Sequence, residues 1–132
     1  MQVDFYLLNE DSESARQNFL LKLILKIYKL RHTLIIKFND SEICSQWDER
    51  LWTFDPLTFI PHHSHKQFLY IESPGLINSK VGINLNESSW LTDAPERIVE
   101  IVPNNPLLRK NSRINFKQYK KLKYNIKIHE IT

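Results

Sequence analysis

The sequence predicts a single α/β domain with a largely parallel sheet. Short apolar segments typical of buried strands alternate along the chain with longer segments of helical periodicity, which is the pattern of parallel strand–helix units. The chain has 132 residues, of which 42% are hydrophobic, and this is enough to form one core without disulfides. We find no internal repeat and no linker, so we expect residues 1–132 to form one domain.

The first strand and the first helix are clearly marked. Residues 3–8, VDFYLL, are a short apolar run that predicts a buried strand. Asp11 and Ser12 then provide caps for a helix over roughly 13–30. That helix is apolar on most sides, and its polar side is a narrow stripe of three lysines: Lys22, Lys26 and Lys29.

The strand–helix pattern continues along the rest of the chain. Residues 33–38 predict a second buried strand, and Asp40 can cap a helix that runs to about residue 52. Further apolar segments predict four more strands, and a basic segment before the last of them predicts a third helix. The four strands cover 67–72, 80–85, 97–102 and 124–128, and the helix covers about 106–121.

Glycine is scarce, since the chain has only Gly75 and Gly82. A phosphate-binding loop needs several glycines close together, because its backbone N–H groups must approach the anion. Two glycines seven positions apart cannot build either common nucleotide-binding motif. We therefore expect no nucleotide and no other cofactor.

The single cysteine, Cys44, cannot form an internal disulfide and gives no sign of an oxidising compartment. The N-terminus has no basic region before an apolar stretch, so we expect no signal peptide. The longest apolar stretch, residues 19–30, contains three lysines and is too short to cross a bilayer. These features predict a cytoplasmic protein with no membrane contact.

Positive charge is concentrated near the C-terminus. Residues 1–100 have 10 Lys and Arg against 14 Asp and Glu, whereas residues 101–132 have 8 against one, Glu130. A basic end on a mildly acidic domain indicates an acidic partner, either a nucleic acid or an acidic peptide.

The second predicted helix is followed by more apolar side chains than a small core needs. Ile43, Trp47 and Leu51 recur at helical spacing and form one apolar face, whereas Trp52 lies about 100° round from Leu51 and points away. An exposed aromatic cluster of this kind marks a protein–protein surface, and the alternative is a segment folded back over the core. The other members of the cluster are Phe54, Leu57, Phe59, Ile60 and Pro61.

The third predicted helix carries a basic stripe with a phenylalanine inside it. Arg109, Arg113, Phe116 and Lys120 fall within about 60° of one another on a helical wheel. Arginine has a planar fork suited to carboxylates or phosphates, and the ring offers an apolar floor. Two alternatives are a solvated helix face and direct nucleic-acid binding. The opposite half of the helix holds Leu107, Ile114 and Leu122, diluted by Asn111, Asn115 and Gln118.

Other chemistry-bearing residues do not form a convincing site. The histidines of the segment 62–65, HHSH, have no cysteine nearby, and adjacent histidines in a loop rarely converge on one metal ion. No nucleophile elbow surrounds any serine. We therefore expect no metal site and no catalytic residues.

Three sequence blocks are similar to one known family. They are FYLL at residues 5–8, WDERLW followed after six residues by FIPH, and VEIVPNNPLLRKNSRINFKQYKKLKYNIKI at residues 99–128. In this order they resemble the chi subunit of bacterial DNA polymerase III over nearly the whole chain. Relatives have a helix where residues 86–95 stand, and Pro95 predicts that this helix is shortened or absent.

The resemblance implies a Rossmann-like fold without nucleotide binding and a non-catalytic adaptor of the clamp loader, at the replication fork. It implies a psi-subunit interface at Trp52, Phe59, Ile60 and Pro61, in a heterodimer with psi, and this surface of the family also contacts a repair helicase. It implies a second partner, the acidic C-terminal tail of single-stranded-DNA-binding protein, and contact with DNA only through partners. The tail site corresponds to the basic helix, with residues Arg109, Arg113, Phe116 and Lys120.

Overall fold

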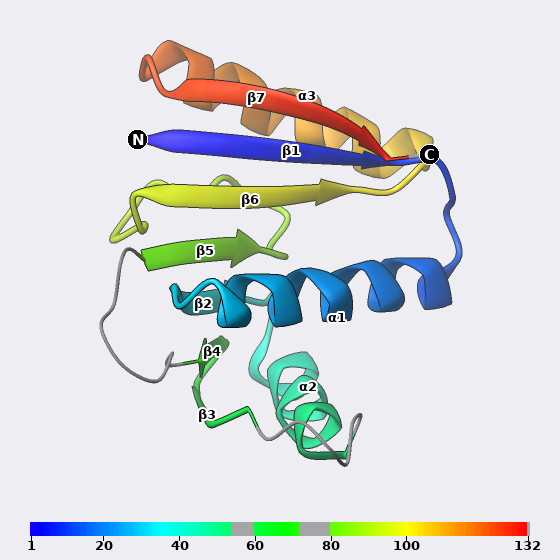
Figure 1. The fold of residues 1–132 in the computed structure, drawn as a ribbon. Helices are drawn as coiled ribbons and strands as arrows, with labels where there is room; N and C mark the ends of the chain where they lie inside the picture. The colour runs from blue at the N-terminus through cyan, green and yellow to red at the C-terminus, as the bar shows by residue number, and fades with distance from the viewer. Residues whose placement is uncertain (54–59, 72–79, 132) are drawn as a thin grey trace.

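The computed structural model describes residues 1–53, 60–71 and 80–131. Strands and helices alternate along most of the chain (Figure 1). In chain order they are β1 (Gln2–Leu8), α1 (Glu13–Lys29), β2 (Thr33–Lys37), α2 (Ser41–Thr53), β3 (His62–His65), β4 (Phe68–Ile71), β5 (Lys80–Asn84), β6 (Arg97–Val102), α3 (Pro106–Lys121) and β7 (Asn125–Ile131).

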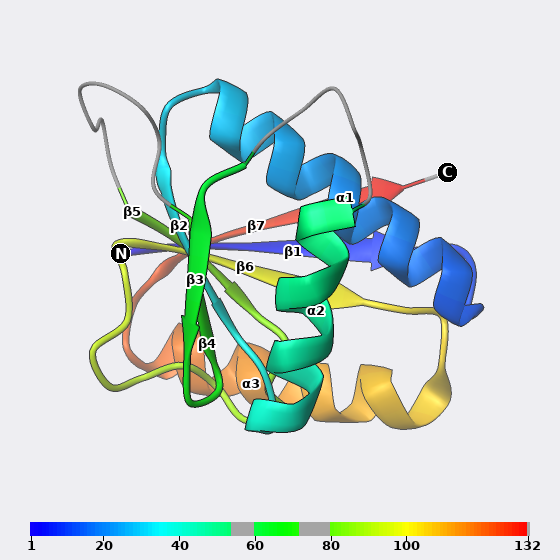
Figure 2. The ribbon, with the colours of Figure 1, turned by 90° about the horizontal axis from the view of Figure 1, so that it is seen from below.

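The described strands form one sheet of seven, in the order β3-β4-β2-β5-β6-β1-β7. The run from β2 through β5, β6 and β1 to β7 is parallel, whereas β4 pairs antiparallel with both β2 and β3. Seen from below, α1 and α3 lie on opposite sides of the sheet (Figure 2). The predicted α/β class with a mostly parallel sheet is confirmed.

Side-chain caps fix where the helices begin. The Ser12 hydroxyl accepts a hydrogen bond from the backbone N–H of Ala15 at the start of α1. The Asp40 carboxylate accepts one from the N–H of Ile43 at 2.8 Å, so both predicted caps are confirmed. Asn105 caps α3 in the same way, with Pro106 directly after it, where its missing N–H costs nothing.

Each face of the sheet has its own core. Buried side chains of α1 and α2 pack with β2, β4 and β5 in one cluster, and Tyr119 of α3 packs with β1, β6 and Trp90 in another. Residues of β1 alternate between the two faces, so that Val3 and Phe5 point toward α3 whereas Asp4 and Tyr6 point to the opposite face. This alternation decides on which face of the sheet each β1 side chain lies.

The segment between β5 and β6 covers the sheet without a helix. Residues 85–96 are all described and contain no helix, as Pro95 predicts. Trp90 is buried there and packs over Gly82 of β5. A Cβ at Gly82 would stand 2.5 Å from Pro95 Cγ and 2.7 Å from Trp90 Cζ3, so this close approach requires glycine.

One expectation about the elements is wrong, and the buried side of α3 is not its apolar side. The segment His62–His65 is the edge strand β3, although its polar sequence resembles a loop. On α3 the buried residues are Asn115 and Tyr119, because their polar atoms find partners inside the fold. The apolar residues that the sequence places on the opposite half are exposed: Leu107 at 68%, Ile114 at 50% and Leu122 at 50%.

Candidate functional sites

Trp52 stands at the end of α2, on the side away from the core. The helix buries Cys44, Trp47 and Leu51, and the side chain of Trp52 is 51% exposed. The prediction that Trp52 points away from the buried face is thus confirmed, whereas Ile43, expected on that face, is exposed. A large exposed indole beside a packed helix end is a chemical feature of protein interfaces.

The indole of Trp52 rests on a histidine that is held from three sides. The ring centroids of Trp52 and His62 are 4.2 Å apart, and the side chain of His62 is fully buried. Its Nδ1 lies 2.7 Å from the carbonyl oxygen of Ile60, and its Nε2 lies 2.8 Å from the carboxylate of Asp48. The hydroxyl of Ser64 donates to the other oxygen of that carboxylate at 2.8 Å. The exposed aromatic side chain therefore has a rigid floor.

The structure places the other residues of this predicted surface differently. Ile60 is only 1% exposed and packs in the core, so its side chain has no surface for a partner. Pro61 is exposed beside it. Phe59 lies outside the described residues. The pairing of His62 with Asp48 could not be predicted from the sequence, because the two residues are 14 positions apart in different elements and no local spacing links them.

The basic helix α3 brings its four predicted residues to one side, with different degrees of burial. Phe116 is half-buried and packs on Phe5 of β1, with ring centroids 5.7 Å apart. Arg109 donates from Nη2 to the carbonyl oxygen of Leu8 at 3.3 Å, and its Nε is buried with no hydrogen-bond partner among the described residues. Arg113 and Lys120 are exposed. Two cations are thus free to reach a ligand, and one is held at the end of β1.

An exposed isoleucine extends the apolar part of this surface. Ile128 of β7 is the register partner of Phe5 and shares its face of the sheet, which is the face that α3 covers. Its side chain is exposed, unlike that of Phe5. The alternation of residues along β7 predicts that Ile126 and Ile128 lie on one face of the strand. That β7 is an edge strand, where such a side chain can be exposed, follows only from the strand order of the sheet.

The positive charge of α3 is not compensated by ion pairs with the other described residues. Among the described residues, the ion pairs involve Arg16, Arg97, His62 and His129, and none involves a cation of α3. Uncompensated charge raises the local concentration of acidic partners and favours their association.

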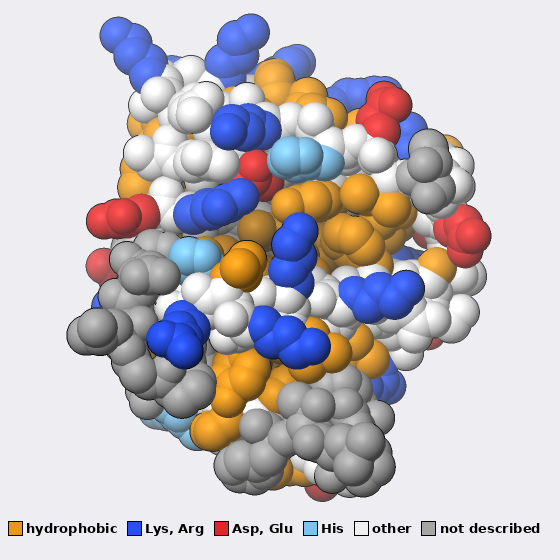
Figure 3. Space-filling view, in the orientation of Figure 1, with side chains coloured by type: hydrophobic (Ala, Val, Ile, Leu, Met, Phe, Trp, Pro, Cys, Tyr) orange, Lys and Arg blue, Asp and Glu red, His pale blue; other side chains and the backbone are white. Residues whose placement is uncertain are grey.

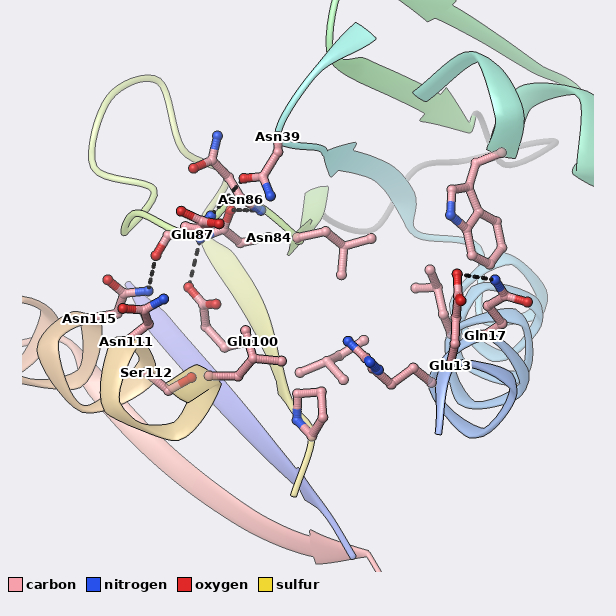
Figure 4. Close-up of a pocket in the computed structure, with 17 residues that line it drawn as sticks. Glu13, Gln17, Asn39, Asn84, Asn86, Glu87, Glu100, Asn111, Ser112 and Asn115 are labelled. Carbon is pink, nitrogen blue, oxygen red and sulfur yellow. Dashed lines mark hydrogen bonds between the residues drawn. The ribbon is translucent and has the colours of Figure 1, made fainter. Parts of the chain in front are cut away.

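A polar cavity of about 490 Å³ lies at the carboxyl ends of β5 and β6, next to α1 and α3 (Figure 4). The buried carboxyl of Glu100 accepts hydrogen bonds from Asn84 Nδ2 and from the hydroxyl of Tyr119, both at 2.8 Å. Burial raises the pKa of Glu100 to about 7, although these hydrogen bonds act in the opposite direction. Burial, together with the charge of Glu100, raises the pKa of the Tyr119 hydroxyl far above its usual value.

The amides around this cavity hold the loop that follows β5. Asn84 donates to the carbonyl oxygen of Ser88, and Asn115 of α3 donates to that of Glu87. Asn39 accepts from the backbone N–H of Glu87 at 2.9 Å. The arrangement stabilises the carboxyl ends of β5 and β6, the end of the strands at which open α/β sheets commonly bind ligands.

The comparison with protein families decides the identity of the chain. The family described as DNA polymerase III chi subunit, HolC, matches residues 1–127. The chain belongs to this family.

Two relatives agree with the family match. The DNA polymerase III subunit chi of Pseudomonas aeruginosa is 26% identical over 137 residues, covering 98% of this chain and 96% of that protein. The protein of the same name from Haemophilus influenzae is 22% identical over 137 residues, covering 96% of this chain and 95% of its own. Members of this family are named as the chi subunit of DNA polymerase III, so we assign the chain to that assembly.

Residues 1–53, 60–71 and 80–131 contain no cluster of three or more His, Cys, Asp or Glu side chains that would hold a metal ion. No helix in the part of the chain that the structure describes has the length and apolar character needed to span a membrane.

Proposed function

We propose that this chain is a non-catalytic adaptor of the DNA polymerase III clamp loader, bridging the psi subunit and single-stranded-DNA-binding protein. Membership of the chi family supports a role within DNA polymerase III. The observation that carries the adaptor role is the separation of two partner-type surfaces. The aromatic surface at the end of α2 and the basic surface of α3 belong to different sides of the sheet (Figure 2).

The psi-binding surface in this proposal consists of Trp52, Phe59 and Pro61. Trp52 supplies the anchor, because its indole is exposed yet held in place by the ring of His62. Ile60 supports the surface from the core. Buried aromatic anchors commonly contribute about 2 kcal/mol or more to binding, which corresponds to about a thirtyfold change in affinity.

The test of this surface is co-purification of tagged psi with Trp52→Ala and with a matched variant, Leu30→Ala. Leu30 is 53% exposed, close to the 51% of Trp52, and lies at the end of α1. We expect psi to be lost with Trp52→Ala and retained with Leu30→Ala. Retention of psi by both variants would contradict the proposed surface.

The tail-binding surface consists of Arg113, Phe116 and Lys120, with Arg109 beside them. An acidic peptide that ends in an aromatic residue presents a terminal carboxylate, a ring and upstream carboxylates. Arg113 is exposed and suited to the terminal carboxylate, and Phe116 to the ring. Lys120 and Arg109 attract the upstream acids, although Arg109 is partly committed to the carbonyl oxygen of Leu8.

Fluorescence anisotropy with the free-acid peptide, its C-terminal amide and a single-stranded oligonucleotide tests this site. We expect micromolar binding of the acid, because a flexible peptide must be ordered, and about tenfold weaker binding of the amide. Arg113→Ala should weaken binding of the free-acid peptide as much as amidation does. Lys121→Ala, on the same helix, should weaken this binding less. Equal binding of acid and amide would contradict the role of Arg113.

A further inference from the structure

A second basic surface lies on the opposite side of the sheet from α3. The lysine stripe of α1 borders it, and β1, β7 and the start of β6 form its floor, because α1 covers the sheet only as far as Val99 and Ile101 of β6 (Figure 1). Its exposed cations are Lys22, Lys26, Lys29, Arg97 and Lys127. Register places Arg97, Asp4, Tyr6, Lys127 and His129 on this one face. We call this surface the open sheet face.

Charge on the open sheet face is almost entirely positive. In Figure 3, Lys and Arg side chains are spread over this view and acidic side chains lie mainly at its margins. Asp4 belongs to the face but is fully buried, where it accepts hydrogen bonds from Arg97 at 2.9 Å and His129 at 3.0 Å. Among the described residues, none of the four lysines is in an ion pair. Their charge is therefore available to a polyanion.

Aromatic side chains lie between these cations. The rings of Tyr6 and His129 are stacked, with centroids 4.7 Å apart and an angle of 17° between their planes. Phe19 of α1 also contacts Tyr6, with centroids 5.5 Å apart. Both Tyr6 and His129 are half-exposed. A small hollow of about 80 Å³ next to them is lined by Tyr6, Lys26 and Arg97 among others.

We propose that the open sheet face binds single-stranded nucleic acid directly. The lysines contact phosphates, and the Tyr6–His129 stack contacts a base. Cations that flank half-exposed aromatic rings are the combination with which proteins hold single strands irrespective of sequence. Stacking on these rings requires an unpaired base, so a duplex fits less well than a single strand.

An acidic peptide also fits the open sheet face less well than a nucleic acid does. Carboxylates are held best by the free planar fork of arginine. The arginine here, Arg97, already donates to Asp4, and the remaining cations are lysines. The surface is distinct from the proposed tail site, so the chain would hold a peptide on α3 and a strand on the open sheet face together. This adds a direct contact with DNA to an adaptor expected to reach it only through partners.

Anisotropy of a fluorescein-labelled thymidine 20-mer with the full chain tests the proposal. Four lysine–phosphate contacts predict a slope of about −3 for the logarithm of affinity against the logarithm of salt, since each contact on a single strand contributes about −0.7. A triple variant, Lys22→Gln, Lys26→Gln and Lys127→Gln, removes three contacts from exposed positions. At 0.1 M salt this lowers affinity about a hundredfold and brings the slope to about −1.

The matched control replaces three exposed lysines of α3 with the same change in net charge: Lys110→Gln, Lys117→Gln and Lys121→Gln. We expect this control to bind the 20-mer within about twofold of the unchanged protein. Equal loss in both triple variants would overturn the proposal, because it would show attraction to overall charge alone. Absence of binding by the unchanged protein at 0.05 M salt would also overturn it.

The aromatic contribution is tested by His129→Gln, which keeps a donor for Asp4 but removes the ring. We expect this variant to bind the thymidine strand at least about fivefold more weakly than the unchanged protein does, and to bind an abasic strand of equal length equally well. Equal binding of the abasic and thymidine strands by the unchanged protein would contradict base stacking. Equally tight binding of polyglutamate would overturn the assignment to nucleic acid. The psi and tail-peptide experiments use other residues, so their failure is distinguishable from failure here.

Discussion

Replacing Glu100 with glutamine is expected to stabilise the protein at high pH and to change little at low pH. Burial raises the pKa of this carboxyl from its ordinary value of 4.5 to about 7, so the folded state binds a proton more tightly than the unfolded chain does. The ionised form is therefore disfavoured in the fold. Stability is lost as pH rises from about 4.5 through about 7 and is constant above that range.

The magnitude follows from the size of the pKa change. One pKa unit corresponds to about 1.4 kcal/mol, so a rise from 4.5 to about 7 corresponds to about 3 kcal/mol of lost stability above pH 7. Glutamine has nearly the same shape and no charge, and its oxygen still accepts from Asn84 and Tyr119. Glu100→Gln should therefore remove this pH dependence.

Urea denaturation of both proteins between pH 4.5 and pH 8 measures this effect. The difference in free energy of unfolding between Glu100→Gln and the unchanged protein should grow by about 3 kcal/mol across that range, in favour of the variant. Other titrating groups are common to both proteins and cancel in the difference. A difference that stays constant with pH would refute the reasoning that burial controls this carboxyl.

Three further changes test the packing and the charges. Gly82→Ala should lower stability by about 1–3 kcal/mol in the same assay, because the new Cβ would overlap Pro95 and Trp90. Asp40→Ala should lower it by about 1 kcal/mol, through loss of the cap of α2. Asp4→Asn should destabilise most above pH 4, because burial alone would raise the pKa of Asp4 but hydrogen bonds from His129 and Arg97 lower it. The stability that these hydrogen bonds contribute is lost as pH falls below about 4. The difference in free energy of unfolding between Asp4→Asn and the unchanged protein should therefore shrink in acid.

The elements that could be predicted from the sequence are those determined by residues close to them in the chain. The apolar run of β1 and the caps at Ser12 and Asp40 lie within a few residues of the elements they define. The strand β3 could not be predicted, because its sequence HHSH is polar and its pairing with β4 depends on the fold. The side chain of its first histidine is buried, with ring nitrogens against the carboxylate of Asp48 on α2 and the carbonyl oxygen of Ile60.

The inner face of α3 shows the same limit. Leucine and isoleucine ordinarily mark the buried side of a helix, yet here Asn115 and Tyr119 are buried instead. Their partners, Ser89, Glu87 and Glu100, come from segments 19 to 28 positions away. The exposed position of Trp52 could be predicted from the helical wheel alone, whereas the burial of Ile60 two residues before His62 could not.

The adaptor role is tested most directly by asking whether both partners bind the chain at once. Sedimentation velocity of the chain with psi and a fluorescent acidic tail peptide follows the peptide signal alone. We predict that the peptide sediments with the chain–psi complex. With Trp52→Ala the peptide should sediment at the rate of the chain without psi. With Arg113→Ala the peptide should be released while psi stays bound. Displacement of the peptide by psi would contradict two separate surfaces, and so would loss of both partners with either single variant.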